Sequence, residues 1–318
     1  MDAASFSVST RDPPMPRSKP RPEVRPARAN AVPPTVSARW LLSAIGIVSL
    51  FAAICAWGVL CLLFWQGSWQ LLYHPASAVA RTPANAGLAF DAVGFAPTDT
   101  GAPQLQGWWI PAAANSRYTV LYLHGQDGNL GDTVDDLVRL HSAGVNVLAF
   151  DYRGYGQSQF AHPSEVRWRE DAESALQYLT GTRHVDPHSI ILAGSALGAN
   201  LALEVAADHP DLGGVVLESA LDAPMNAIFL DPRARLVPAR LLVRDRFDTA
   251  APAAALRIPS LWFVQDSRLH QSGPAKTAGP FEKVPSAKMR IWTTASSGEK
   301  RDFENALVRW LDDLNRQR

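Results

Sequence analysis

The segment Ile190-Ile191-Leu192-Ala193-Gly194-Ser195-Ala196-Leu197-Gly198-Ala199-Asn200 decides the fold of this chain. Its first residues are apolar, as in a buried strand, and the residues after Ala196 are typical of a helix. Gly194 and Gly198 stand two residues before and two residues after Ala196. A sharp turn from strand to helix needs small residues at both positions, so the spacing predicts such a turn with Ala196 at its apex.

Short strand-like runs alternate with helical stretches from about residue 86 onward. The strand candidates are Leu88–Phe95, Gln106–Ile110, Thr119–His124, Val145–Phe150, Ser189–Ala193, Gly214–Glu218, Ser260–Val264 and Lys288–Thr293. Helical stretches are expected near 132–142, 166–180 and 197–208, and Asp302 is expected to cap a last amphipathic helix. This alternation predicts an α/β fold, with a mostly parallel sheet of about eight strands and helices on both faces.

The stretch 221–258 separates two strand candidates by more residues than an ordinary crossover needs. It contains four prolines, at 224, 232, 238 and 252. We expect a short helical cap excursion over the carboxyl edge of the sheet, where ligands bind in such folds. The expected folded domain covers 66–318.

The N-terminal part of the chain has a different composition. Residues 1–39 are rich in proline and arginine and are expected to form a disordered tail. Residues 41–65 contain no charge and are long enough to span a bilayer, so 40–65 is expected to be one transmembrane helix. A cleaved signal peptide is the alternative, but the run is longer than the core of a signal peptide.

The distribution of charge around this run predicts its orientation. Basic residues gather on its N-terminal side, and the first charge after it is Arg81. The tail is therefore expected to be cytoplasmic and the domain extracytoplasmic, in the inner (cytoplasmic) membrane if the cell is bacterial.

The composition of the chain argues against several classes of protein. The net charge of the 318 residues is zero, which gives no indication of nucleic-acid binding. No zinc-binding spacing or phosphate loop is found, so no metal and no cofactor is expected. The two cysteines, Cys55 and Cys61, both lie in the apolar run, so the folded domain needs no disulfide.

Two further motifs lie at the ends of predicted strands. The first, Leu121-Tyr122-Leu123-His124-Gly125-Gln126-Asp127-Gly128-Asn129, ends a strand in a glycine-rich turn. The second is Phe150-Asp151-Tyr152-Arg153-Gly154-Tyr155-Gly156-Gln157-Ser158. With the strand–turn–helix segment, they resemble the α/β-hydrolase superfamily, especially its membrane-anchored Bem-like branch related to depalmitoylating thioesterases. The resemblance covers about 70–318.

The resemblance is supported by three shorter strings, which are Leu72-Tyr73-His74-Pro75, Gly107-Trp108-Trp109-Ile110-Pro111 and the segment 241–248. It implies an esterase or thioesterase site on a nucleophile elbow. It also implies an oxyanion hole formed by the backbone N–H groups of Gln126 and Leu197. A small acyl-type ligand is the implied partner.

The sequence departs from the family pattern at the nucleophile. Ala196, not a serine, stands at the expected apex, and alanine has no hydroxyl group that could attack a carbonyl carbon. Ser195 is the alternative nucleophile. With Ser195 at the apex, however, Leu197 would occupy a position that has to be small.

The sequence departs from the pattern at the base as well. No histidine follows His270, and Glu299 stands where the family has its catalytic histidine. A carboxylate of ordinary pKa is a weak base for a serine hydroxyl. His270 could reach Ser195 only by an unorthodox route.

Several residues are candidates for the acid of the triad. Asp266 fills the acid position if the turn that carries it is shortened, whereas an ungapped alignment places Arg268 there. Asp222 is a further candidate in space.

These departures leave two hypotheses. The first is a pseudo-enzyme that acts as a membrane-tethered ligand-binding or scaffold protein, and an engineered serine-to-alanine change would explain Ala196 but not Glu299. The second is an active hydrolase of esters, thioesters or amides with a rearranged site.

Overall fold

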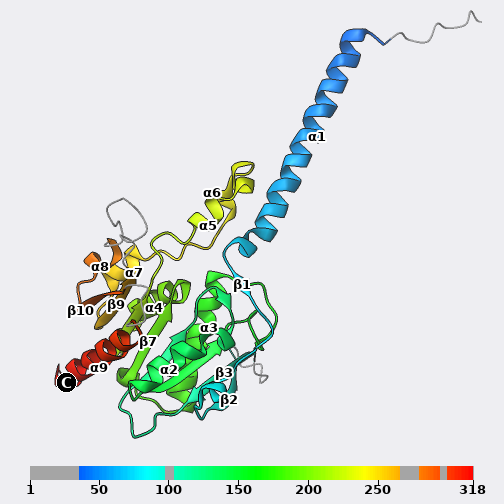
Figure 1. The fold of residues 1–318 in the computed structure, drawn as a ribbon. Coiled ribbons are helices and arrows are strands. Elements are labelled where there is room, and N and C mark those ends of the chain that lie inside the picture. The colour runs from blue at the N-terminus through cyan, green and yellow to red at the C-terminus, as the bar shows by residue number, and fades with distance from the viewer. Residues whose placement is uncertain (1–35, 97–103, 266–278, 294–298, 318) are drawn as a thin grey trace, which may run out of the picture. The chain divides into compact units, whose positions relative to one another are not determined.

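The computed structural model describes residues 36–96, 104–265, 279–293 and 299–317 (Figure 1). Its main feature is an eight-stranded sheet with the strand order β10-β9-β8-β7-β4-β6-β3-β2. The strands are β2 (Asp91–Phe95), β3 (Leu105–Ile110), β4 (Thr119–Leu123), β6 (Asn146–Asp151), β7 (Ile190–Ser195), β8 (Gly214–Glu218), β9 (Ser260–Gln265) and β10 (Lys288–Thr293). β3 pairs antiparallel with β2 and β6, and the other neighbours are parallel.

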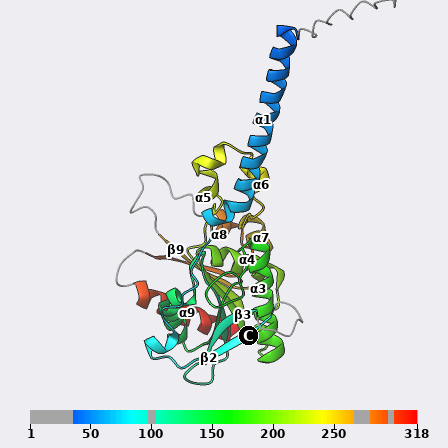
Figure 2. The same cartoon turned by 90° about the vertical axis from the view of Figure 1, so that its right-hand side faces the viewer.

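Helices cover both faces of the sheet, because buried apolar side chains alternate to the two sides of the strands. The helices are α1 (Ala38–Gly67), α2 (Val134–Ser142), α3 (Glu165–Gln177), α4 (Leu197–Asp208), α5 (Asn226–Phe229), α6 (Ala239–Leu242), α7 (Ala250–Ala255), α8 (Gly279–Lys283) and α9 (Glu299–Gln317). α2 and α9 share one core cluster with the sheet, and α3, α4 and α7 share the other. Figure 2 shows α9 on the side of the sheet opposite α3 and α4.

The chain divides into two compact units, which are Met1–Ile54 and Cys55–Arg318. The helix α1 is long and apolar enough to cross a membrane. Its C-terminal part, from Cys55 to Gly67, belongs to the same unit as the sheet.

A second, two-stranded sheet was not predicted. β1 (His74–Pro75) pairs in parallel with β5 (Asp127–Gly128). The segment that follows α1 is thereby attached to the glycine-rich turn after β4.

The eight strands of the main sheet correspond to the eight predicted runs, with ends that differ by a few residues. The predicted cap of the last helix is wrong, because α9 begins at Glu299 and Asp302 lies inside its first turn. Carboxylates in the first turn suit the positive end of the helix dipole without being the cap. The stretch 221–258 contains α5, α6, α7 and a 3₁₀ turn at Pro232–Arg235.

Candidate active site

The turn between β7 and α4 brings the backbone to Ala196 in an unusual conformation. Ala196 has φ 48° and ψ −121°, a region that residues with a side chain rarely adopt. Its N–H donates to the Glu218 carbonyl at 2.9 Å, and its carbonyl accepts from Ala199 at 3.1 Å. The methyl group of Ala196 therefore stands where the strand turns into the helix.

The two neighbouring glycines explain how the turn is so tight. A Cβ added to Gly194 would lie 2.3 Å from the Gly198 carbonyl oxygen. A Cβ added to Gly198 would lie 2.2 Å from the Leu123 carbonyl oxygen. Both distances are shorter than any real contact, so the backbones of β4, β7 and α4 meet here without room for side chains.

The hydroxyl group of Ser195 lies on the face of the sheet that α2 covers. Its Oγ is 3.1 Å from the Tyr122 hydroxyl, which donates to the Asp136 carboxylate at 2.9 Å. Tyr122 has a single proton to donate, so Ser195 donates to it in turn. Burial raises the pKa of Tyr122 above its ordinary value, so this phenol stays neutral and is not a base for Ser195.

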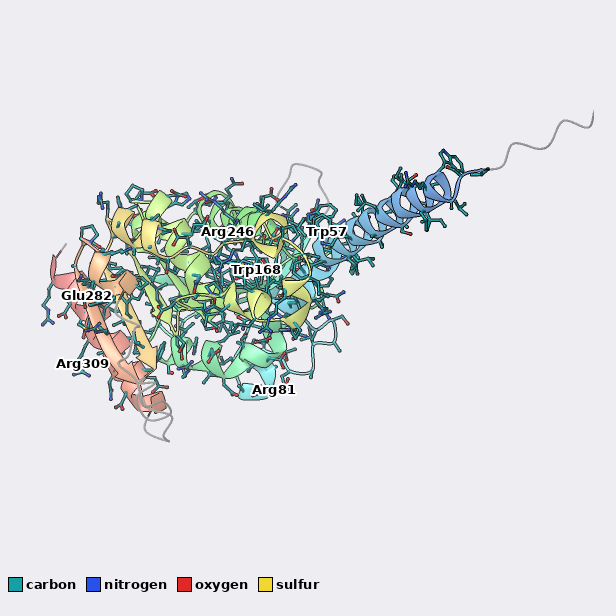
Figure 3. The ribbon with its side chains drawn as sticks, turned by 90° about the horizontal axis from the view of Figure 1, so that it is seen from above. Trp57, Arg81, Trp168, Arg246, Glu282 and Arg309 are labelled. Atoms are coloured by element: carbon teal, nitrogen blue, oxygen red, sulfur yellow. The ribbon has the colours of Figure 1, made fainter. Side chains whose placement is uncertain are left out.

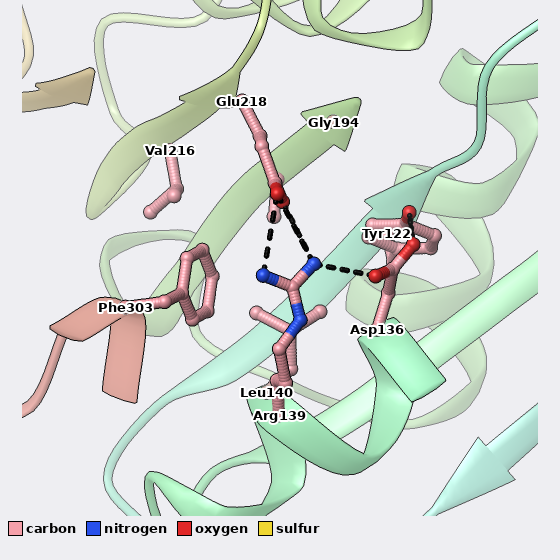
Figure 4. A pocket seen from close by; sticks show the side chains of 9 residues that line it. Tyr122, Asp136, Arg139, Leu140, Gly194, Val216, Glu218 and Phe303 are labelled. Carbon is pink, nitrogen blue, oxygen red and sulfur yellow. Dashed lines mark hydrogen bonds and ion pairs between the residues drawn. The ribbon is translucent and has the colours of Figure 1, made fainter. Parts of the chain in front are cut away.

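Asp136 belongs to a cluster of charged side chains beside the elbow. Arg139 donates to Asp136 and to both carboxylate oxygens of Glu218, the latter at 3.1 Å (Figure 4). The space between them is a cavity of ≈ 10 Å³, which is room for about one water molecule. The cluster therefore fixes side chains and does not hold a substrate.

The turn after β4 lies against the other side of the elbow. The Leu197 N–H, one of the two expected oxyanion-hole donors, donates to the side-chain Oε1 of Gln126 at 3.3 Å. The Nε2 of Gln126 donates to Asp127 Oδ2 at 2.9 Å, and the other oxygen of this carboxylate accepts from His74 Nδ1 at 2.7 Å. A chain of side chains thus connects the segment after α1 to the elbow.

A buried histidine lies just before this turn. The pKa of His124 is lowered to about 4 by burial, so its ring is neutral near pH 7. Its Nδ1 is 2.8 Å from the Gly125 carbonyl, and its Nε2 is 3.7 Å from Asp151, whose own pKa burial raises to about 7. The His124 ring packs against Tyr152 and Tyr155 on the α3 face of the sheet. This packing fixes the residue at which the turn after β4 begins.

Asn200 is a contributor that the sequence reasoning missed. Its Nδ2 donates to the carbonyls of Leu221 and Phe247 at 2.8 Å and 3.2 Å, and its Oδ1 accepts from the Leu221 N–H. One side chain of α4 thereby holds both ends of the excursion that follows β8. An asparagine among the apolar residues in the first half of α4 was the signal for this role.

The remaining predicted site residues are not brought together in the described structure. Glu299 is the first residue of α9, and Asp222 is exposed after β8, with a pKa that partial burial raises. Asp266, Arg268 and His270 lie outside the described residues. Among the described residues, no group of His, Cys, Asp and Glu could hold a metal ion.

Comparison with known proteins shows the family of this chain. A family model described as serine aminopeptidase, S33, matches residues 114–269. The protein Rv2307c of Mycobacterium tuberculosis is 30% identical over 226 residues, which cover 69% of this chain and 75% of that protein. The chain belongs to the α/β-hydrolase superfamily.

More distant members of the superfamily are similar over smaller parts of the sequence or in fold alone. The alpha/beta hydrolase domain-containing protein 17C of Mus musculus is 32% identical over 126 residues, 39% of each chain. The esterase Pf2001 of Pyrococcus furiosus superposes with a TM-score of 0.57 at 17% identity, over 76% of this chain and 98% of that one. This last likeness shows the α/β-hydrolase fold.

Proposed function

We propose that this α/β hydrolase is a pseudo-enzyme, which binds an acyl-type ligand or acts as a scaffold at a membrane. The observation that carries the proposal is the methyl group of Ala196 at the apex of the elbow, with φ 48°. In this fold the side chain at that apex attacks the substrate, and a methyl group cannot.

The surroundings of the elbow support a binding role. The Leu197 N–H is already engaged, at 3.3 Å, by the Oε1 of Gln126. A ligand carboxylate oxygen is a stronger acceptor for this N–H than a neutral amide oxygen, and it would take the place of the amide. The Gln126 side chain would then swing toward Asp127, to which its Nε2 already donates.

Active hydrolysis through Ser195 is the second candidate function, and one observation favours it. The relay from Ser195 through Tyr122 to Asp136 gives the serine proton a path to a carboxylate. One feature opposes it. Burial raises the pKa of Tyr122, so the phenol stays neutral and does not act as the base for Ser195.

The test of both candidates is labelling of the full-length protein with a fluorophosphonate, combined with a panel of acyl esters and thioesters. We expect no labelling and no turnover above that of heat-denatured protein. Labelling that Ser195→Ala abolishes would establish the active hydrolase instead. Binding is measured in parallel by titrating a non-hydrolysable acyl ketone against the intrinsic tryptophan fluorescence.

The membrane arrangement is part of the proposal. The helix α1 is taken to span an inner (cytoplasmic) membrane once, with the residues before it on the cytoplasmic side and the domain at 66–318 outside the cytoplasm. The basic residues before the span and their scarcity just after it support this orientation. Protease added to cells with a permeabilised outer layer should digest the domain. Protection of the domain until the inner membrane is lysed would show the opposite topology.

A further inference from the structure

Large apolar side chains are exposed at two places in the folded domain. After α1, the exposed ones among the described residues are Phe160 (83%), Val166 (66%), Leu230 (72%), Leu236 (63%), Leu241 (83%) and Val308 (39%). All but Val308 belong to two short segments, 160–166 and 230–241. Single exposed apolar residues are ordinary, but such a concentration indicates contact with something apolar.

The second segment is also basic. The exposed arginines between α5 and α7 are Arg233, Arg235, Arg240, Arg244 and Arg246, whereas the acids over the same stretch are Asp231, Asp245 and Asp248. Exposed leucines alternating with arginines are typical of chain that lies at the boundary of headgroups and acyl chains. Long arginine side chains can keep their charge at the headgroups while the backbone lies deeper.

The position of this segment beside α1 indicates what covers it. The indole Nε1 of Trp57 donates to the Leu236 carbonyl at 3.0 Å, and both residues belong to the unit Cys55–Arg318 (Trp57 is labelled in Figure 3). Trp57 precedes Trp65, the end of the uncharged run, by eight residues, which is about 12 Å along a helix. Leu236 therefore lies beside a part of α1 that is itself apolar and exposed.

A cavity lies between the excursion and the segment that ends α1. A space of ≈ 760 Å³ is lined by Trp65 near the end of α1, by Trp69 in the 3₁₀ turn that follows, and by Ile228, Leu242 and Arg244 from the excursion. The Trp69 ring stacks on His162 at 4.9 Å between ring centroids, which connects the 160–166 segment to the same place. Tryptophans that flank an apolar span are typical of the membrane–water interface.

We propose that the segment 226–244, together with Phe160 and Val166, dips into the membrane leaflet from which α1 emerges. The occupant of the apolar surface is the lipid of that leaflet, with its acyl chains against Leu230, Leu236 and Leu241. Anionic headgroups pair with the arginines. The inference rests on the proposed transmembrane role of α1 and is independent of whether the elbow is catalytic.

The experiment uses the full-length protein reconstituted in vesicles of phosphatidylcholine and phosphatidylglycerol. In a background carrying Cys55→Ser and Cys61→Ser, Leu236→Cys and Leu241→Cys are each labelled with an environment-sensitive fluorophore. We expect nitroxides on the lipid acyl chains to quench both labels several-fold more than a label at Arg309→Cys. Arg309 is an exposed position on α9 and serves as the matched control.

A second single-cysteine variant tests separately whether α1 spans the bilayer. It retains Cys55, which is exposed on α1, as its single cysteine. If Cys55 is quenched while the labels at 236 and 241 behave like the label at 309, the inference is wrong and the span stands. If Cys55 is not quenched either, α1 does not span the bilayer and both proposals fail.

Discussion

The side-chain oxygen of Gln126 accepts a hydrogen bond from the backbone N–H of Leu197 at 3.3 Å. We propose this N–H as one of two donors of an oxyanion hole, and on that proposal an amide of the protein itself occupies the site. At 3.3 Å the bond is longer than the usual N–H···O distance, so a ligand oxygen can replace it at little cost.

Removal of this amide should expose the Leu197 N–H. We expect Gln126→Ala to speed hydrogen exchange of the Leu197 amide by up to about tenfold, because one neutral hydrogen bond contributes about 1 kcal/mol. Binding of an acyl ligand should tighten by a similar factor, since the ligand no longer displaces a competitor. Hydrogen exchange read by mass spectrometry measures the first effect, and Gln159→Ala, at an exposed loop position, is the control. Unchanged exchange at Leu197 would contradict the contact.

The strained apex gives a prediction on stability. Ala196 holds a positive φ, which costs about 1–3 kcal/mol for a residue with a Cβ, whereas glycine adopts it freely. Glycine also loses more entropy on folding, by about 0.5–1 kcal/mol. We therefore expect Ala196→Gly to stabilise the protein by about 1 kcal/mol in urea unfolding followed in detergent.

The control for this stabilisation is Ala199→Gly, inside α4, where glycine brings no relief of strain and should destabilise. If Ala196→Gly destabilised the protein as Ala199→Gly does, the positive φ at the apex would not be a source of strain.

The pair of His124 and Asp151 predicts a pH dependence. Native Asp151 keeps its proton up to about pH 7, whereas the unfolded chain loses it near the ordinary pKa of 3.8, so stability falls as the pH rises between these values. His124 acts in the opposite sense. Its native pKa of about 4 lies below the ordinary 6.5, so stability falls as the pH drops through that window.

Asp151→Asn separates the two slopes. Without the carboxyl group, the falling limb between pH 3.8 and 7 disappears, and stability relative to the unmodified protein should increase with pH across that window. Below pH 3.8 the carboxyl group and the amide are both neutral, so the stabilities of the two proteins should converge. Urea unfolding at several pH values measures the difference, and Asp312→Asn on the exposed face of α9 should leave the profile unchanged. A pH-independent difference would mean that Asp151 is ionised in the native protein.

The sequence predicts the main sheet well because each strand is recognisable from its own residues. Continuous apolar runs such as Thr119–Leu123 can be buried on both faces in only one kind of layer, and the glycines at 194 and 198 specify a tight turn. By contrast, β1 and β5 pair through two residues each, His74–Pro75 and Asp127–Gly128, with no apolar pattern that would announce them.

The side-chain arrangement of the site was less predictable for a related reason. The direction of Ser195 follows from the period of two along β7, which places it on the face of Ala193, and Tyr122 is the β4 partner of Ala193. That alternation was available in the sequence, but the strand register that joins Tyr122 to Ser195 was not. The contact of Gln126 with Leu197 depends on a side-chain rotamer, which no periodicity encodes.

The last prediction concerns restoration of activity. Ala196→Ser places a hydroxyl group at the apex, and Glu299→His supplies an imidazole where the family has its base. Each alone should remain within a few-fold of background for p-nitrophenyl acetate, because triad members act as a unit and one of them without the others contributes little. We expect the double variant to recover measurable turnover, provided that Asp266 orients the new imidazole, and Asp266→Asn should then remove most of the gain. Ser195→Ala in the double variant is the matched control, since the Ser195 hydroxyl is engaged by Tyr122 and should not contribute. Robust turnover by the unmodified protein, lost on Ser195→Ala, would instead show that the family reaction runs through the neighbouring serine.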